Sequence, residues 1–276
     1  MKPPPFAYQR PADVPAAVAA LAAAGGAGRL LAGGQTLGPM LNLRLVQPSL
    51  LVDIRRIDAL KRIERRGNVL AIGAAVTHAA LEDRADPSPT GRLLSHAASA
   101  IAYRAIRNFG TVGGSLAHAD PAADWITLMT LLDARLSIVG VSGTRQVLMA
   151  QFMKGAFTTE IGPAELLAEI EIEELSADAR WGYYRLCRKV GEFPDALGAA
   201  VFDRGRSVAR VLAGALDGVP VSLPGLAGRV ASEGAAVATL DAVMQAVREA
   251  VPGLDAVELQ LHAAAVRRAI AQALAS

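Results

Sequence analysis

The sequence predicts an α+β fold that contains two kinds of sheet. Short apolar segments alternate with helical ones near the N-terminus, which favours a small parallel sheet. Beyond a polar stretch at 175–180, three strand-like segments follow one another without a helix between them, as in an antiparallel meander. After Pro224 the pattern becomes helical. A meander followed by helices indicates an α+β unit of about 100 residues in the C-terminal part.

The N-terminal unit is predicted from its helix caps and its apolar runs. Asp13 is a suitable N-cap, Pro15 fits the first helical turn and Gly25-Gly26 is a suitable stop, so a helix is expected between them. The unit continues with a strand over 29–32, a glycine turn, a helix over 37–45 and a buried strand over 50–54.

The middle of the chain mixes strands with helices. Thr77 is expected to cap a helix that begins at His78, and a helix over 93–101 is expected to continue toward Arg107. The glycine-rich segment 110–115 is expected to interrupt that helix as a loop, before a further helix over 121–133. The remaining strands are expected over 69–74, 135–141, 146–149 and 167–172.

The C-terminal part begins at the polar stretch, where we expect a domain boundary. The chain is thus divided into residues 1–175 and 176–276, and the pattern of the first part changes again near residue 56. The meander is expected to have one polar face. Its strands are predicted over 181–186, 198–203 and 208–215, and the helices that follow over 226–232, 240–250 and 256–275.

Composition excludes several classes of protein. Cys187 is the one cysteine among 276 residues, so this chain alone can form neither a disulfide, a CxxC zinc site nor an iron–sulfur cluster held by four cysteines. The 28 basic and 26 acidic residues nearly balance, which disfavours nucleic-acid binding. The longest uncharged stretch, 14–28, is too short and too rich in alanine for a transmembrane segment. We expect a soluble, cytoplasmic protein.

Familiar catalytic and nucleotide-binding motifs are missing. The segment Gly26-Ala27-Gly28 begins like a Rossmann fingerprint, but it precedes a strand where the fingerprint follows one. There is no P-loop and no GxSxG elbow, and the four histidines are widely separated. Cys187 is interpreted as a packed strand thiol. No catalytic residue and no protein-held metal are predicted.

Two glycine loops are the candidate ligand-binding motifs. The first leaves a strand and enters a helix, so its glycines and free N–H groups suit a pyrophosphate, although a tight turn between strand and helix is the alternative. The second contains paired glycines between hydroxyl side chains, and two such loops in one chain are better explained together. The two loops read Leu30-Leu31-Ala32-Gly33-Gly34-Gln35-Thr36-Leu37 and Thr111-Val112-Gly113-Gly114-Ser115.

These loops and their flanks carry a resemblance to a known family. The chain is similar to the FAD-binding medium subunit of molybdenum hydroxylases, a group that includes the carbon monoxide dehydrogenase flavoprotein and the xanthine dehydrogenase FAD domain. The resemblance covers nearly the whole chain, including the closing helix at 261–269. It rests above all on Ala32-Gly33-Gly34-Gln35-Thr36 and on Ile106-Arg107-Asn108-Phe109-Gly110-Thr111-Val112-Gly113-Gly114-Ser115-Leu116-Ala117-His118-Ala119-Asp120.

The resemblance implies a fold and a set of cofactor contacts. The fold is the vanillyl-alcohol-oxidase / PCMH type, in which two α/β subdomains, split here near residue 56, hold FAD and a carbon monoxide dehydrogenase flavoprotein-like domain follows. Pro194-Asp195 departs from the family pattern near the flavin ring. The implied FAD contacts are Leu30 to Leu37, Thr111 to Ser115, Asp124, Ile101, Leu167 and Lys189.

The resemblance also implies a function within a complex. A molybdopterin-binding large subunit would oxidise the substrate, and a 2Fe-2S small subunit would relay single electrons. FAD on this chain would pass them to NAD, oxygen or a quinone, in a dimer of heterotrimers. Two alternatives stay open: a self-sufficient flavin oxidase with its own small substrate, and an assembly module that has lost its flavin.

Overall fold

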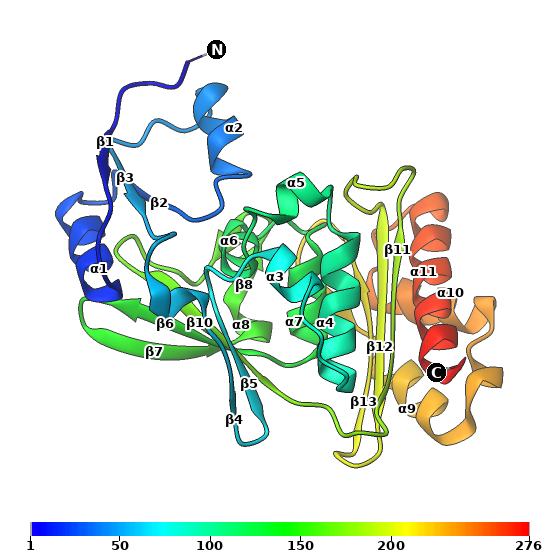
Figure 1. Cartoon of the computed structure of the whole chain (residues 1–276). Helices are drawn as coiled ribbons and strands as arrows, with labels where there is room; N and C mark the ends of the chain where they lie inside the picture. Colours follow the sequence, from blue (N-terminus) through cyan, green and yellow to red (C-terminus); the bar gives the residue numbers. More distant parts are fainter. Residues whose placement is uncertain (1, 276) are drawn as a thin grey trace.

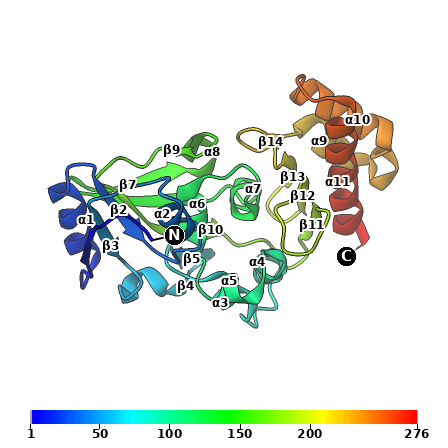
Figure 2. The same cartoon turned by 90° about the horizontal axis from the view of Figure 1, so that it is seen from above.

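The structure, a computed structural model, describes residues 2–275 and is built in layers. Figures 1 and 2 show the same succession from the N-terminal to the C-terminal side: a small sheet, a larger sheet, a group of helices, a third sheet and an outer group of helices. The α+β class predicted from the sequence is confirmed. No helix among residues 2–275 is both long enough and apolar enough to cross a membrane.

The first layer is the predicted small parallel sheet. Asp13 caps its first helix by accepting a hydrogen bond from the backbone N–H of Ala16, and Gly25 and Gly26 with positive φ follow the helix end. The second helix stops at Asn42, short of the expected end at 45, because Arg44 turns into the left-handed region. The strand order is β1 (Ala7–Gln9), β3 (Leu50–Asp53), β2 (Gly28–Leu31), with α1 (Val14–Ala23) and α2 (Leu37–Asn42).

The second layer is an antiparallel sheet of five strands. Its central strand is bulged between Leu167 and Glu169. This strand and three of the other four strands of the sheet were predicted from the sequence. The strand order is β4 (Ile63–Arg66), β5 (Val69–Gly73), β10 (Leu166–Glu173), β6 (Arg135–Gly140), β7 (Gly143–Leu148). Short elements complete the layer: η1 (Asp58–Lys61), α8 (Met149–Phe152), β8 (Met153–Gly155) and β9 (Thr158–Thr159).

The third layer consists of helices, and here one prediction is wrong. The helix expected over 93–101 starts earlier, after the Ser88 cap, and does not continue toward Arg107. Ala102 has a positive φ, and the buried Arg107 guanidinium donates hydrogen bonds to the carbonyls of Ile101 and Ala102, which breaks the helix. The helices are α3 (His78–Glu82), α4 (Pro89–Ala100), α5 (Arg104–Arg107), α6 (Val112–His118) and α7 (Asp124–Leu131).

The glycine-rich segment 110–115 was predicted to be a loop, and most of it is helix. Thr111 is the N-cap of α6 and accepts a hydrogen bond from Gly114 N at 3.1 Å, so Gly113 lies within the first helical turn. A Cβ at Gly113 would come within 2.6 Å of the Ala74 carbonyl oxygen. The glycine therefore allows the start of the helix to pack directly on the chain that leaves β5.

The third sheet is the predicted meander, but its polar face is absent. All eight residues of its second strand are buried, because helices cover both faces. Glycines at 182 and 198 let the last helix approach the sheet closely. The order is β11 (Arg180–Leu186), β12 (Ala196–Asp203), β13 (Val208–Gly214), β14 (Val221–Ser222), followed by α9 (Pro224–Glu233), η2 (Ala235–Val237), α10 (Leu240–Ala250) and α11 (Ala256–Ala275).

Two apolar cores meet at β12. Leu197, Ala199 and Val201 join a core shared with α4, α6, α7 and the five-stranded sheet. Ala200 and Phe202, on the opposite face, join a core shared with α9, α10 and α11. The larger core thus takes side chains from both sides of residue 175, and the division of the chain into domains at that point stays a prediction.

Candidate functional site

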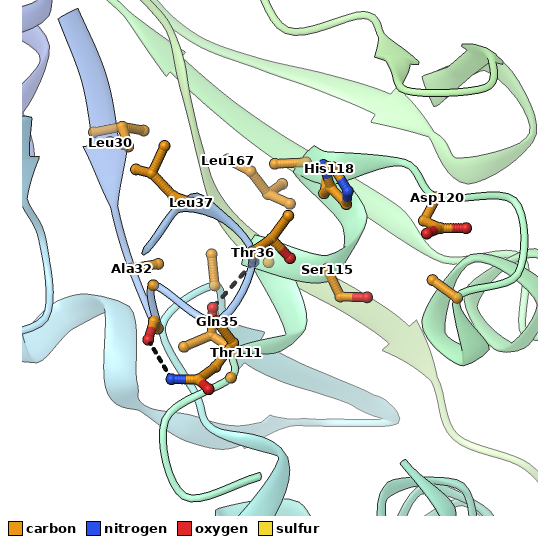
Figure 3. A pocket seen from close by; sticks show the side chains of 18 of the residues that line it. Leu30, Ala32, Gln35, Thr36, Leu37, Thr111, Ser115, His118, Asp120 and Leu167 are labelled. Atoms are coloured by element: carbon orange, nitrogen blue, oxygen red, sulfur yellow. Dashed lines mark hydrogen bonds between the residues drawn. The ribbon is translucent and has the colours of Figure 1, made fainter. Parts of the chain in front are cut away.

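A cavity of about 860 Å³ lies where the layers of the N-terminal half meet the hairpin loop between β11 and β12. Its wall combines β2, the turn into α2, the start of α6, β10 and residues 191–193 of the hairpin. Figure 3 shows side chains of these segments gathered around it, among them Thr36 from the first glycine loop and Ser115 from the second. The cavity is large enough for an extended, dinucleotide-sized ligand.

Most of the sequence-predicted site residues line this cavity, and three do not. Val112 is fully buried in the core, Leu31 packs near Gly34 outside the lining, and Lys189 is exposed and paired with Glu192 at 3.8 Å. The residues that line the cavity are Leu30, Ala32, Gly33, Gly34, Gln35, Thr36, Leu37, Ile101, Thr111, Gly113, Gly114, Ser115, Asp124 and Leu167.

The first glycine loop presents a row of backbone donors. The N–H groups of residues 34–37 have no hydrogen-bond acceptor among residues 2–275. The turn is closed from within: Gln35 Nε2 donates to the Gly33 carbonyl at 3.1 Å, and Gly34 has a φ of 70°, which suits only glycine well. Consecutive free N–H groups in a turn form a concave site for an anion.

The second glycine loop is different, because the N–H groups of residues 112–115 already have acceptors. The N–H groups of Val112 and Gly113 donate to the carbonyls of Val76 and Ala74, at 3.0 and 2.9 Å. From the sequence, the two loops were expected to bind one ligand together, and the structure gives them different groups with which to do so. This loop can offer a ligand the Ser115 side chain and the close surface of Gly114, but no row of free N–H groups.

Glycine 33 joins the two loops. A Cβ at this position would lie 2.1 Å from the backbone oxygen of Phe109 and 2.8 Å from Gly110 Cα. From the sequence, the glycines were expected to let a ligand approach the backbone. At Gly33 the group that approaches is the chain at residues 109–110, which leads into the second loop, so the glycine sets the distance between the two loops.

Asp124, Tyr183 and Arg185 form a buried charged cluster, and two of them, Asp124 and Arg185, line the cavity. Asp124 Oδ1 accepts a hydrogen bond from Tyr183 Oη at 2.8 Å and lies 2.8 Å from Arg185 Nε. Burial raises the pKa of both Asp124 and Tyr183, and Arg185 opposes this at each of them. The Asp124 side chain is only 3% exposed, so most of its carboxylate is occupied by protein groups.

Arg185 connects three segments and was missed by the sequence analysis. Besides Asp124, it donates to the carbonyl of Ala100 at the end of α4 and to that of Glu192 in the hairpin loop. One signal was available in the sequence: Tyr183 and Arg185 are two residues apart on a strand, so their side chains belong to one face of the sheet. Because the meander was expected to have a polar face, these two side chains were not considered as part of a buried site.

His78 is a second cavity residue that was not predicted to be functional. Its Nδ1 accepts a hydrogen bond from Trp125 Nε1 at 3.0 Å, and its backbone N–H donates to the Gly110 carbonyl. Burial, assisted by the nearby Arg107, lowers the pKa of His78 to about 4. The imidazole is therefore neutral at physiological pH.

This low pKa predicts a loss of stability in mild acid. Because the folded-state pKa of about 4 lies below the ordinary 6.5, the unfolded chain takes up the proton first as the pH falls. We expect the free energy of unfolding to lose about 3 kcal/mol between pH 6.5 and 4 through this group alone. Urea titrations across that range measure it.

The matched variants are His78→Gln and His96→Gln, the second on the exposed face of α4. His78→Gln should flatten the pH dependence, and His96→Gln should not. Burial also lowers the pKa of His262, which therefore contributes in the same direction in every variant, so only differences from the wild type are compared. An equal pH dependence in wild type and His78→Gln would contradict this assignment.

Comparison with known proteins identifies the family. The model of the FAD binding domain in molybdopterin dehydrogenase matches residues 4–173. The carbon monoxide dehydrogenase medium chain of Hydrogenophaga pseudoflava is 35% identical over 231 residues, which is 83% of this chain and 80% of the relative. The 6-hydroxypseudooxynicotine dehydrogenase complex subunit alpha of Paenarthrobacter nicotinovorans is 38% identical over 200 residues, which is 72% of this chain and 67% of the relative.

Solved structures agree over the full length. A chain of the Cu,Mo-CO dehydrogenase in its cyanide-inactivated form superposes with a TM-score of 0.91 at 30% identity, covering 100% of this chain and 99% of the other. A chain of quinoline 2-oxidoreductase from Pseudomonas putida 86 gives a TM-score of 0.87 at 32% identity, with the same coverage. The similarity therefore includes the third sheet and the C-terminal helices, beyond the part that the family model matches.

The residues present fit the cofactor of this family. A dinucleotide needs donors for its pyrophosphate and a long cavity for its two ring systems, and the chain has four unpaired backbone N–H groups at the wall of a cavity of about 860 Å³. The chain belongs to the family of FAD-binding domains of molybdopterin dehydrogenases, and it is an oxidoreductase subunit whose cofactor is FAD.

Proposed function

We propose that this chain is the electron-transfer subunit of a molybdenum hydroxylase complex and that FAD occupies the cavity between the two glycine loops. The observation that carries the proposal is the row of free N–H groups at residues 34–37, which faces a second, internally satisfied loop across one cavity. The first loop would bind the pyrophosphate, because it presents four successive backbone donors that no acceptor among residues 2–275 takes up.

The other wall residues would orient the rest of the cofactor. Thr36 and Ser115 add hydroxyl groups that can bind the sugar alcohol chain, and Ile101 and Leu167 add apolar surface from α4 and β10. Lys189, expected from the resemblance to approach the ring, lies outside the cavity lining, whereas Arg185 lies in it. FAD, when bound, accepts and releases one or two electrons, which allows it to join one-electron and two-electron chemistry.

The partners in this proposal are a molybdopterin-binding large subunit and a 2Fe-2S small subunit, assembled as a dimer of heterotrimers. Two observations support separate partner chains. The sequence has one cysteine, whereas an iron–sulfur cluster needs about four, and the relatives are named as a medium chain and as a subunit of a complex. Electrons would arrive from the iron–sulfur subunit and leave to an external acceptor.

The substrate of such a complex would meet another chain. The relatives and solved structures are named for carbon monoxide, 6-hydroxypseudooxynicotine and quinoline, which share no common functional group, yet their flavin subunits keep this fold. A flavin subunit that does not touch the substrate accounts for that range. The residues that we assign to the cavity are therefore assigned to the cofactor and not to a substrate.

The experiment that tests the proposal uses the purified full-length chain. We expect it to take up added FAD, and we expect a chemically reduced 2Fe-2S subunit from the same organism to bleach the bound flavin in a stopped-flow mixing experiment. An apo-chain that takes up no FAD, or a bound flavin that the reduced partner leaves oxidised, would contradict it. Turnover of a simple alcohol or amine by the isolated chain would favour the self-sufficient oxidase.

A further inference from the structure

The protonation of His78 is fixed by a neighbour that can only donate. The indole N–H of Trp125 is a donor without acceptor capacity, and it points at His78 Nδ1 at 3.0 Å. Nδ1 must therefore be the unprotonated nitrogen. Because the ring is neutral, its single N–H is on Nε2.

The Nε2 nitrogen faces the cavity. His78 and Gly110 both line it, and a Cβ at Gly110 would lie 2.8 Å from Nε2, so the nitrogen reaches the surface of the second loop. No residue between 2 and 275 accepts a hydrogen bond from it. Three fully enclosed side-chain atoms in the same range have no hydrogen-bond partner: Thr127 Oγ1, His262 Nδ1 and Arg185 Nε, the last of which is nevertheless ion-paired with Asp124. His78 Nε2 is not among these enclosed atoms.

The ring has little freedom to turn away. Trp125 is fully buried, and His78 itself is 6% exposed. The backbone around it is fixed too, since His78 N donates to the Gly110 carbonyl and Thr77 forms a β-bridge with Thr111. The donor is thus held beside the N-cap residue of α6, within the wall that we assign to the cofactor.

We propose that His78 is a cofactor-binding residue, whose Nε2–H donates a hydrogen bond to an acceptor atom of FAD in this cavity. The inference rests on the proposed function, because it requires FAD to occupy the cavity. Trp125 is the positioning residue, since it fixes which nitrogen carries the proton. A neutral donor binds an acceptor atom without adding a positive charge to the flavin site.

The first test is FAD affinity. His78→Phe keeps a planar ring and removes the donor, and His96→Phe makes the same change at an exposed histidine that stacks on Trp181. Titrating the apo-chain of each variant with FAD, followed by flavin fluorescence, should give a dissociation constant about 5- to 20-fold higher for His78→Phe. The value for His96→Phe should match the wild type.

The second test does not require a variant to fold. In ¹⁵N-labelled wild-type protein, the His78 ring should show a protonated Nε2 and an unprotonated Nδ1, and addition of FAD should shift the Nε2 resonance and slow exchange of its proton. Trp125→Phe should mix the two tautomers in the apo-chain.

The outcomes separate this inference from the proposed function. If the wild type takes up FAD while His78→Phe binds it equally well, or while FAD leaves the Nε2 resonance and its proton exchange unchanged, the role of His78 is wrong and the proposed function stands. If the wild type takes up no FAD, both fail. Should His78→Phe not fold, the NMR experiment on the wild type decides.

Discussion

Replacing Gly33 by alanine is expected to raise the dissociation constant for FAD by roughly 100-fold or more, which corresponds to the loss of one or two hydrogen bonds to the charged pyrophosphate at about 1.5–3 kcal/mol each. The added Cβ would lie 2.1 Å from the Phe109 carbonyl oxygen. The obstructing atoms are backbone, and they belong to the segment that leads into the Thr111 cap. The two glycine loops must therefore separate, and the free N–H groups at 34–37 lose their position relative to the other wall.

The matched control is Gly38→Ala, five residues further along the chain. A Cβ there meets nothing within 4 Å, and the residue is helical, so the change should leave FAD binding intact and stabilise α2 by up to about 1 kcal/mol. Flavin fluorescence titration gives the affinities, and circular dichroism checks that both variants are folded. Wild-type affinity in folded Gly33→Ala would contradict the assignment of this glycine.

Replacing Arg185 by methionine is expected to destabilise the fold by about 3–5 kcal/mol, the usual effect of leaving one partner of a buried ion pair alone. Asp124 would keep its hydrogen bond from Tyr183 but lose the cation that lies 2.8 Å from its Oδ1. The carbonyls of Ala100 and Glu192 would lose a donor at the same time. Urea unfolding at pH 7 measures the loss.

A second substitution distinguishes the charge effect from the loss of packing. Asn at position 124 removes the unpaired charge, so the Arg185→Met, Asp124→Asn double variant should be more stable than Arg185→Met alone. Arg188→Met, on the exposed part of the same hairpin, is the control and should change stability by less than about 0.5 kcal/mol. A double variant less stable than Arg185→Met would show that the charge of Asp124 is not what Arg185 compensates.

The parts of the fold that follow from local chemistry were predicted correctly. Asp13 and Thr77 cap helices where the sequence places them, because a cap depends only on a side chain and on N–H groups two or three residues further along the chain. The strands of the meander were found in order for a similar reason, since turn residues separate their apolar runs.

The errors arose where tertiary contacts decide the structure. Paired glycines at 33–34 and 113–114 look alike in the sequence, yet one pair lies in a turn with free donors and the other in the first turn of a helix. The difference arises from a residue distant in sequence: the carbonyl of Ala74 accepts the hydrogen bond of Gly113 N–H. The prediction of a polar face on the meander was wrong for the same reason. Tyr183 and Arg185 of β11 are buried, and Asp124 of α7 accepts a hydrogen bond from the first and forms an ion pair with the second.

The family resemblance predicted the cofactor, while the residue assignments needed the fold. Lys189 was assigned by its place along the chain, and the hairpin carries it out of the cavity lining. Arg185 and His78, which line the cavity, belong to segments distant from either glycine motif. Contacts of α3 and β11 with α7, through His78–Trp125 and Arg185–Asp124, bring them to the same cavity, and one sequence alone does not show those contacts.

The position of β12 links the cofactor site to the far end of the molecule. Because opposite faces of this one strand complete both apolar cores, neither core can open without exposing the other. Any ligand that binds only the native chain adds a free energy of RT ln(1 + [L]/Kd) to its unfolding, and here that gain extends to both cores. Saturation with FAD should therefore slow hydrogen exchange in α11 as well as at the cavity, so that the C-terminal helix reports whether the flavin site is filled.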